Sequence, residues 1–400
     1  MLITAPRVIP ATGPAGLLSP GYVSIAGGRI TGVGAGPPPG PPDLVLDAGF
    51  LLPGLIDLQL NGGYGADLSA VDAASWARLA VRLPETGTTA FLATFTSAPV
   101  PELARTLGSA GELVAAGPLP GARVLGVHLE GPFLSPRRAG AHRREWLVAP
   151  APAAVGDLLA AGAGVLRLVT LAPELAGGLA AVARLAAAGL VVSIGHSEAT
   201  AAETAAAAGA GARMVTHLFN AQRPFHHREP GVTGQALTDH RLTCGLIAEP
   251  SHVSPVACAL AFAAASARIC LVTDAVAAAG MPPGRYLLGG QDITVASPGR
   301  PPRLADGTLA GSVLRMDEAV ANTVAAGVAL PLAVAAATRI PADLIGRPDL
   351  GRLTPGAAAD LAWLGDDLRA RAVWVAGEQV YPVPTPPGTP CAVPTGPGGG

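Results

Sequence analysis

The sequence predicts an α/β fold: a (β/α)8 TIM-type barrel with a small β-sandwich domain formed from both chain ends. Eight short, apolar, β-prone runs alternate with alanine-rich helical stretches through the middle of the chain, a pattern typical of a buried parallel sheet. Short strand-like segments occur at both ends of the chain. Polar residues directly follow several of the eight runs, as they do on the carboxyl-terminal face of a barrel enzyme.

The two ends of the chain carry the segments expected in the small β domain. Residues 1–52 contain short β-prone pieces separated by Gly and Pro turns, and similar pieces return at 359–364 and 372–380. We therefore expect residues 1–52 and 355–383 to form one β-sandwich. Residues 384–400 are rich in Pro and Gly and have no hydrophobic period, which predicts a disordered tail.

The barrel is expected to occupy residues 53–354. Its eight strands are predicted at residues 55–60, 90–95, 123–129, 165–171, 190–194, 213–218, 244–248 and 269–273. Because the carboxyl ends of all barrel strands point to one face, the polar residues that follow these strands should meet there.

The composition excludes several classes of function. Of the 400 residues, 50% are hydrophobic and 14% are charged, and the formal net charge is −2. Such a chain can bury a large core and cannot coat a polyanion, which argues against global disorder and nucleic-acid binding. The sequence contains no lysine, so a Schiff-base lysine, a phosphate-loop lysine and a carboxylated lysine bridging two metals are all excluded. Arginine must therefore supply the fixed positive charge.

The sequence also indicates a cellular compartment. The charge-free stretch of residues 319–338 is rich in alanine and too weakly hydrophobic to span a membrane. The N-terminus lacks the pattern of a signal peptide. The four cysteines show no CxxC pair; they are Cys244, Cys258, Cys270 and Cys391. We therefore expect a cytoplasmic protein with reduced thiols, and no membrane or nucleic-acid partner.

The histidines suggest a metal site. All eight lie between residues 128 and 252, and His196 and His217 each follow a β run, as does Glu130. A single histidine at a strand end is more often structural than a ligand. Two neutral imidazoles and one carboxylate, however, form a common catalytic zinc set that leaves a coordination position open for water.

Asp274 is the candidate general base. A bound metal ion would lower the pKa of its water ligand, but a base must still take the proton. Asp274 follows the eighth run and is placed to do so. An Asp after a strand also often caps the following helix, so the residue pattern alone leaves both roles open.

The segment 216–231 combines His217 with Asn220, Arg223 and Arg228. Arginine together with backbone amides is how a protein without lysine would hold a phosphate group. A solvated loop with surface arginines is the alternative. His252, which follows the seventh run, has the same two interpretations.

An ordered set of motifs over about residues 1–380 resembles the N-acetylglucosamine-6-phosphate deacetylases of the amidohydrolase superfamily. The motifs lie at residues 53–62, 128–133, 195–200, 216–221, 228–231, 272–275, 306–312 and 354–361. The resemblance implies a barrel with a β-sandwich built from both chain ends. It also implies hydrolysis of N-acetylglucosamine 6-phosphate to glucosamine 6-phosphate and acetate, in amino-sugar catabolism or cell-wall sugar recycling.

The resemblance also assigns roles to residues. Glu130, His196 and His217 would bind the metal, Asp274 would act as base and then as acid, and His142 would polarise the amide carbonyl. The implied substrate-binding residues are Gln59, Gly131, His142, Asn220, the Ala221 backbone, Arg228 and His252. Arg228 would reach the site from a neighbouring subunit, which implies a homodimer.

The chain departs from the superfamily pattern at the first strand. A His-x-His pair often supplies a second metal site there, whereas this chain has Gln59 and Asn61, and amides are poor zinc ligands. We therefore expect one divalent ion per subunit, Zn²⁺ first, with Fe²⁺ and Co²⁺ suited to the same donors. The segment 222–227 and Arg143 also depart from the family pattern, which leaves the preferred amino sugar open.

Three alternatives stay open from the sequence. The substrate could be another N-acetyl amino-sugar phosphate such as N-acetylgalactosamine 6-phosphate, or a cyclic amide processed by a related amidohydrolase. A non-catalytic barrel that binds a sugar phosphate is the third, and the presence of both the metal set and Asp274 argues against it.

Overall fold

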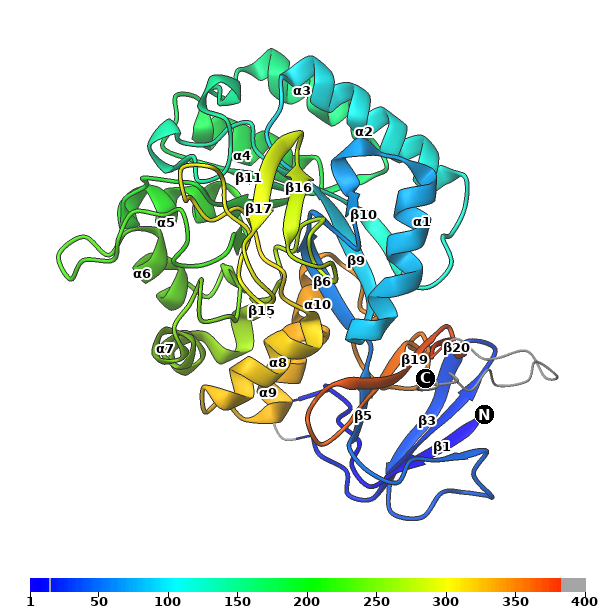
Figure 1. The fold of residues 1–400 in the computed structure, drawn as a ribbon. Helices are drawn as coiled ribbons and strands as arrows, with labels where there is room; N and C mark the ends of the chain where they lie inside the picture. Colours follow the sequence, from blue (N-terminus) through cyan, green and yellow to red (C-terminus); the bar gives the residue numbers. More distant parts are fainter. Residues whose placement is uncertain (14–15, 383–400) are drawn as a thin grey trace, which may run out of the picture.

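A computed structural model describes residues 1–13 and 16–382 and contains an eight-stranded parallel barrel (Figure 1). Its strands are β6 (Leu55–Leu60), β9 (Thr88–Phe95), β10 (Arg123–Glu130), β11 (Leu166–Leu171), β12 (Val191–Ile194), β13 (Met214–Val215), β14 (Thr243–Leu246) and β15 (Ile269–Leu271). Each strand pairs with the next in chain order. All eight predicted strands are therefore confirmed, and so is the fold class.

The seam between the last and first strands closes just beyond their carboxyl ends. The backbone N–H of Asp274 donates to the Gln59 carbonyl at 2.9 Å, and the N–H of Asn61 donates to the Ala275 carbonyl at 2.8 Å. This closure places Gln59 and Asn61, at the end of the first strand, beside Asp274, which follows the last strand. Strand β13 is shorter than predicted because the chain leaves the sheet after Val215, and His217 takes a φ of +27°.

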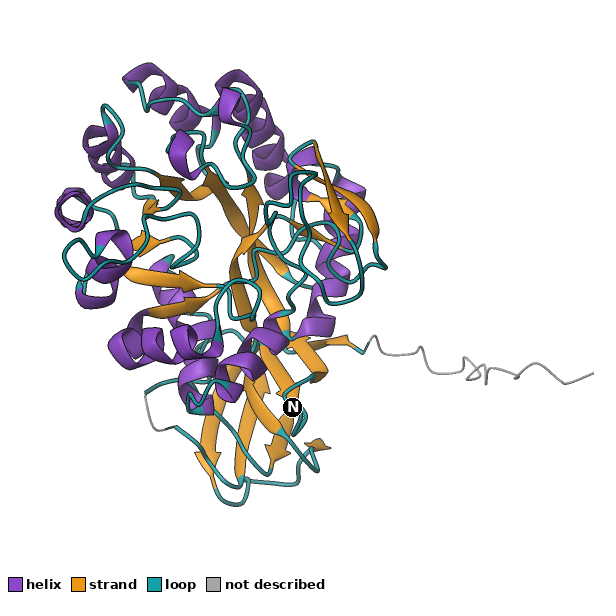
Figure 2. Ribbon diagram, turned by 60° about the vertical axis from the view of Figure 1, so that its left-hand side comes forward, coloured by secondary structure: helices purple, strands orange, loops and turns teal. Residues whose placement is uncertain are grey.

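Helices cover the outside of the barrel (Figures 1 and 2). They are α1 (Ala73–Arg82), α2 (Val100–Ala115), α3 (Pro152–Ala161), α4 (Gly178–Ala187), α5 (Ala201–Ala210), α6 (Gly231–Thr238), α7 (Pro255–Ala265), α8 (Met316–Ala325), α9 (Leu330–Ala337) and α10 (Arg339–Leu344). Short 3₁₀ helices are η1 (Leu68–Ala70), η2 (Leu83–Thr86), η3 (Pro136–Arg138), η4 (Arg144–Trp146) and η5 (Ser266–Arg268). Within the described ranges, none of the helices has the length and apolar character needed to span a bilayer.

Local sequence accounts for where several helices begin. Asp72 caps α1 by accepting from the Ser75 N–H at 2.8 Å. Thr200 and Glu203 form a reciprocal capping box at the start of α5. Proline in the first turn opens α2, α3, α7 and α9, where the missing N–H is not needed.

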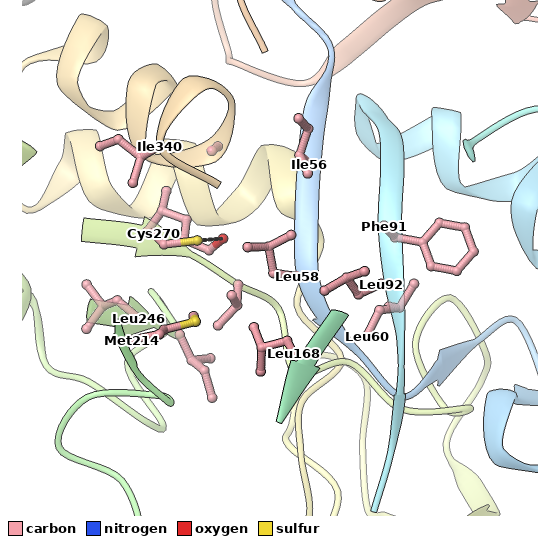
Figure 3. Packing of buried hydrophobic residues seen from close by; sticks show 14 of the residues in the cluster. Ile56, Leu58, Leu60, Phe91, Leu92, Leu168, Met214, Leu246, Cys270 and Ile340 are labelled. Carbon is pink, nitrogen blue, oxygen red and sulfur yellow. Dashed lines mark hydrogen bonds between the residues drawn. The ribbon is translucent and has the colours of Figure 1, made fainter. Parts of the chain in front are cut away.

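The barrel core explains the continuous apolar runs. Every residue of β6 and β9 is buried, because helices cover one face of the sheet and the barrel interior covers the other. Figure 3 shows side chains from this core, including Leu58 on β6, Leu92 on β9 and Cys270 on β15. Aliphatic packing therefore holds the scaffold on which the site is built.

Strands from both chain ends form two four-stranded sheets. The first has the order β3-β2-β1-β4 and contains β1 (Leu2–Ala5), β2 (Gly21–Ala26), β3 (Arg29–Ala35) and β4 (Leu44–Val45). The second has the order β20-β19-β18-β5 and contains β5 (Phe50–Pro53), β18 (Leu361–Leu364), β19 (Ala370–Val375) and β20 (Glu378–Tyr381). One hydrophobic core, which includes Ile3, Val23 and Trp374, joins them. The exact domain boundaries stay a prediction, and residues 384–400 lie outside the described part of the chain.

The segment between β15 and α8 contains a hairpin that the sequence did not predict. Its strands are β16 (Gly284–Leu288) and β17 (Gln291–Val295), and Figure 1 shows them across the barrel opening. A second, very short hairpin joins β7 (Gly62–Gly63) and β8 (Ala66–Asp67). A separate apolar cluster that includes Val276, Leu288 and Ile293 anchors the longer hairpin.

Candidate active site

A cavity of about 340 Å³ lies at the carboxyl ends of the barrel strands. Eight of the residues predicted to bind metal or substrate or to act in catalysis line it: Glu130, His142, His196, His217, Asn220, Ala221, His252 and Asp274. Gln59, Gly131 and Arg228 do not line it. Residues up to 144 positions apart in the chain thus meet at one opening, as the barrel geometry predicted.

Three donor atoms converge at the floor of this cavity. The Nε2 atom of His217 lies 3.1 Å from Glu130 Oε1, and the Nε2 atom of His196 lies 3.3 Å from the same oxygen. The two Nε2 atoms are 3.1 Å apart. A shared cation would satisfy all three donors at once, so their chemistry fits a divalent ion.

His142 offers a fourth donor near the same carboxylate. Its Nε2 atom lies 3.8 Å from Glu130 Oε2, and Glu130, His142 and His196 form a group that could hold a metal ion. Two overlapping ligand sets therefore share Glu130 and His196. The imidazole hydrogen bonds distinguish between them.

The Nδ1 atoms of the two imidazoles make opposite contacts. His196 Nδ1 lies 2.8 Å from the Arg138 carbonyl and must donate to it, which leaves the Nε2 lone pair free for a metal. His142 Nδ1 accepts from the Ser97 backbone N–H at 3.2 Å and lies 2.9 Å from the Ser97 hydroxyl, which can also donate to it. A neutral His142 must then carry its proton on Nε2, where it is a donor and not a ligand. We therefore favour His217 over His142 as the third ligand.

Sharp backbone turns aim the site residues into the cavity. His196, His217 and Asp274 have φ values of +47°, +27° and +52°, which non-glycine residues rarely adopt. Each follows its strand within a few residues, so the chain reverses while the side chain points into the barrel mouth. Hydrogen bonds hold the turn at Asp274: its N–H donates to Gln59 O, and its carbonyl accepts from Ser312 N–H at 2.8 Å.

The site's two carboxylates have pKa values shifted in opposite directions. Burial and the charge of Glu130 raise the pKa of Asp274 to about 6. Burial would also raise the pKa of Glu130, but hydrogen bonds and charge from His196 and His217 outweigh it and hold that pKa well below its usual range. Such a split is typical of a site in which one carboxylate stays ionised and the other exchanges a proton.

Burial and neighbouring groups also shift the pKa values of the histidines in and below the site. Burial, with a smaller contribution from the neighbouring His196 imidazole, lowers the pKa of His142 to about 3, so this ring is neutral near pH 7. Burial also opposes the charged form of His217, but its contact with Glu130 raises its pKa. Burial lowers the pKa of His128, which lies deeper in the barrel, to about 4.

Gln59 and Asn61 act as hydrogen-bond donors to the carboxylates. Gln59 Nε2 donates to Glu130 Oε1 at 3.1 Å and to Asp274 Oδ1 at 3.2 Å. Asn61 Nδ2 donates to Asp274 Oδ1 at 2.7 Å. The amides thus occupy the side of the site where the superfamily often has His-x-His.

The capping role considered for Asp274 is wrong. The next helix, α8, begins at Met316, and its N-cap residue is Arg315. Asp274 instead faces the cavity and accepts from Gln59 and Asn61.

Among the residues expected to bind phosphate, Asn220, Ala221 and His252 line the cavity. His252 is oriented by a contact of 2.5 Å between its Nδ1 and Glu249 Oε1. Arg223 is turned away, since its Nε donates to the Glu198 carbonyl at 2.9 Å. Arg228 is exposed, and its Nη1 lies 3.2 Å from His227 Nε2.

Gly131 has a steric role in the structure. Its φ is +94°, and a Cβ atom placed on it would lie 2.1 Å from Ser97 Oγ. Only glycine fits this turn after Glu130, which brings Ser97 close to His142.

Sequence reasoning missed part of the cavity wall. Arg137 and Arg138 line it from the segment after Glu130, and their position beside the 128–133 motif could have indicated them. Leu288 and Gln291 come from the unpredicted hairpin. Gln291 Nε2 donates to the Ala141 carbonyl at 2.9 Å, which ties the hairpin to the segment that carries His142.

The fold and site define a class of protein. Residues 50–380 match the amidohydrolase family model, and the chain belongs to the amidohydrolase family. The N-acetylglucosamine-6-phosphate deacetylase of Bacillus subtilis (strain 168) is 42% identical over 304 residues, covering 74% of this chain and 76% of that protein. The N-acetylgalactosamine-6-phosphate deacetylase of Escherichia coli O157:H7 is 39% identical over 334 residues, covering 83% and 88%.

A solved structure is similar over nearly the whole chain. It is that of a D267A mutant of N-acetyl-D-glucosamine-6-phosphate deacetylase from Mycobacterium smegmatis in complex with N-acetyl-D-glucosamine 6-phosphate. The TM-score is 0.90 with 40% identity, and the match covers 95% of this chain and 99% of that one. The family resemblance found in the sequence motifs is confirmed.

Proposed function

We propose that this protein is a metal-dependent hydrolase that removes the N-acetyl group of N-acetylglucosamine 6-phosphate, giving glucosamine 6-phosphate and acetate. The main support is the convergence of Glu130, His196 and His217 donor atoms within 3.3 Å, beside an Asp274 whose pKa is raised to about 6. The names of the relatives above agree with this reaction.

Glu130, His196 and His217 are the proposed ligands of one divalent ion, with Zn²⁺ preferred and Fe²⁺ or Co²⁺ as alternatives. When bound, such an ion supplies a Lewis acid that polarises the amide carbonyl and lowers the pKa of a water molecule. Because Gln59 and Asn61 direct their amide N–H groups at the carboxylates, we propose a single ion per subunit.

Asp274 is the proposed proton carrier. A carboxylate with a pKa of about 6 is largely ionised near neutral pH, so it can accept a proton from the attacking water. The same group, once protonated, can donate to the nitrogen of the departing amine. Donation from Gln59 and Asn61 to Oδ1 leaves Oδ2 as the oxygen that exchanges the proton.

His142 is the proposed electrophile. The Ser97 N–H contact with Nδ1 supports a neutral ring protonated on Nε2, and His142 lines the cavity. This N–H can donate to the acetyl oxygen as negative charge develops on it. A neutral ring suits this task because it does not add a full charge beside the metal site.

The phosphate group is proposed to contact Asn220, the Ala221 backbone and His252, which line the cavity. Arg228 is exposed and lies outside the cavity of its own chain. We therefore propose a homodimer in which Arg228 reaches the neighbouring active site. We also propose a cytoplasmic location, with which the three buried, free cysteines of the described residues agree.

N-acetylgalactosamine 6-phosphate is the second candidate substrate, because one relative of 39% identity carries that name. The two sugars differ in the orientation of one hydroxyl group. Their relative kcat/KM values decide between them.

The test is acetate release by the purified protein from three compounds: N-acetylglucosamine 6-phosphate, N-acetylgalactosamine 6-phosphate and unphosphorylated N-acetylglucosamine. Each is assayed as purified, after chelator treatment, and after zinc is restored. We expect fast, chelator-sensitive release from a phosphorylated sugar only. Release from none of the three would reject the proposed substrate class, and two tightly bound ions per active subunit would reject the single-metal assignment.

A further inference from the structure

A chain of buried polar side chains crosses the barrel interior beneath the candidate metal site. His128 on β10 is at its centre. Its Nε2 lies 2.8 Å from Thr170 Oγ1 on β11, and its Nδ1 lies 3.4 Å from Thr94 Oγ1 on β9. Beyond Thr170, the hydroxyl chain continues to Thr216 at 2.7 Å and from there to Ser193 at 2.6 Å.

We call these five residues the polar layer: Thr94, His128, Thr170, Ser193 and Thr216. Each is at most 1% exposed. Bulky aliphatic side chains usually fill such positions inside a barrel. Removal of both partners of a buried hydrogen bond, with shape retained, can leave stability unchanged, so folding alone does not require this layer.

The polar layer is adjacent in sequence to the proposed metal ligands. His128 is two residues before Glu130, on the same side of β10. Thr216 immediately precedes His217, and Ser193 lies three residues before His196. The layer therefore connects all three segments that carry the proposed ligands.

The polar layer also contacts the strand that carries the Gln59 and Asn61 amides. Thr94 Oγ1 accepts from the Leu60 N–H at 3.0 Å, and Leu60 lies between Gln59 and Asn61. Strands β6, β9, β10, β11 and β12 are thus linked by side-chain contacts in addition to the sheet hydrogen bonds. Hydrogen bonds are directional. They therefore fix the position of each strand along the barrel axis, relative to its neighbours, more narrowly than aliphatic packing does.

We propose that the polar layer sets the relative positions of Glu130, His196 and His217, with Thr170 as its central positioning residue. Thr170 is central because it contacts both His128 and Thr216, and so joins the Glu130 strand to the His217 segment. This inference rests on the proposed function, because it takes these three residues as the metal ligands. Thr170 lies below the cavity and does not line it.

The first comparison is Thr170→Val against Thr323→Val. Both substitutions remove one hydroxyl from a residue that is 0% exposed and preserve its shape. Thr323 Oγ1 donates to the Ala319 carbonyl within α8 and also contacts the Cys258 thiol, and neither partner lines the cavity, so loss of the hydroxyl should leave the site unchanged. For both variants and the wild type, zinc affinity is measured by competition with a chromogenic chelator, together with kcat, KM and the thermal midpoint.

We expect T170V to fold, to bind zinc about tenfold more weakly or worse, and to lose kcat while KM changes by less than about twofold. T323V should match the wild type in zinc affinity and kcat. Thr170→Ser restores the hydroxyl without the methyl group and should recover most of the zinc affinity. If T170V binds zinc as tightly as T323V, or if T170S is as impaired as T170V, the proposal is overturned.

The zinc measurement separates this proposal from the proposed function. A wild-type protein that binds zinc and releases no acetate would reject the deacetylase function, while the T170V and T323V affinities would still decide the role of the layer. A wild-type protein that binds none of Zn²⁺, Fe²⁺ and Co²⁺ would overturn both.

Discussion

Strand β10 carries a charged group at each end, and the two ends are built in opposite ways. At its amino end, Arg123 forms a two-pronged ion pair with Asp360 of the β-sandwich, with distances of 3.0 and 3.1 Å. At its carboxyl end, Glu130 is held by imidazoles and an amide, and no arginine pairs with it or with Asp274 among the described residues. The charge of Asp360 is neutralised by Arg123. Glu130 and Asp274 have no arginine partner, so their charges stay available for metal binding and proton transfer.

The two ends also differ in what surrounds the turns of the backbone. Near Asp360, a core that is aliphatic apart from tryptophan joins the two sheets, and the one left-handed residue that contacts the carboxylate, Ala376, donates its N–H to Asp360 at 2.7 Å. At the opposite face, His196, His217 and Asp274 all adopt left-handed conformations that cost stability. The sandwich end of β10 therefore contributes stability, whereas the cavity end gives up stability for chemical function.

The largest effect should come from Asp274→Asn. Loss of a general base typically lowers kcat by about a thousandfold, while the amide can still accept from Gln59 and Asn61. Zinc should still bind, and the thermal midpoint should not fall, because the substitution removes an unfavourable buried charge. Steady-state kinetics and unfolding curves check this, and near-normal turnover would show that Asp274 is not the base.

The matched substitution at the other end is Asp360→Asn. It weakens two charge-assisted hydrogen bonds to Arg123, so we expect the free energy of unfolding to fall by about 2 kcal/mol. The kcat value should stay within about twofold of the wild type. Urea unfolding and the acetate assay measure the two quantities, and a large loss of kcat in this variant would remove the contrast between the two ends.

A smaller effect is expected for Arg228→Ala. Loss of one charged contact to phosphate should lower kcat/KM for the phosphorylated sugar by about tenfold, and leave the unphosphorylated sugar unaffected. Arg78→Ala, which changes an exposed arginine on α1, is the control.

Mixed dimers test whether Arg228 acts across the interface. In a dimer of one R228A subunit and one D274N subunit, the first subunit keeps Asp274 and would receive Arg228 from its partner. Mixing the two inactive or impaired proteins should therefore raise the rate. No increase on mixing, with subunit exchange verified, would place Arg228 outside the neighbouring site.

The smallest effect concerns Asp57, a buried carboxyl at the seam of the barrel. Burial raises its pKa to about 7, so the folded state holds a proton that the unfolded chain has already lost. Stability from this group is complete below the unfolded pKa of 3.8, falls as pH rises above it, and stops falling only once pH has passed the folded pKa of about 7. Between pH 6 and pH 8 the wild type should lose about 1 kcal/mol relative to Asp57→Asn, measured by urea unfolding of the metal-free proteins.

The barrel and much of the site could be predicted from the amino-acid sequence. Its apolar runs identified all eight strands, because a strand that is buried on both faces consists almost entirely of apolar residues. Glu130, His196, His217 and Asp274 could be singled out because parallel strands deliver the residues after them to one face.

The hydrogen-bond partners of these residues become visible only in the folded chain. The Ser97 contact that makes His142 a donor, and the Glu198 contact that turns Arg223 away, join residues 45 and 25 positions apart. The hairpin β16–β17 and the polar layer likewise have no periodic signal in the sequence. Periodicity reports which face of an element is buried, whereas the partner of each buried polar group is fixed only when the barrel closes.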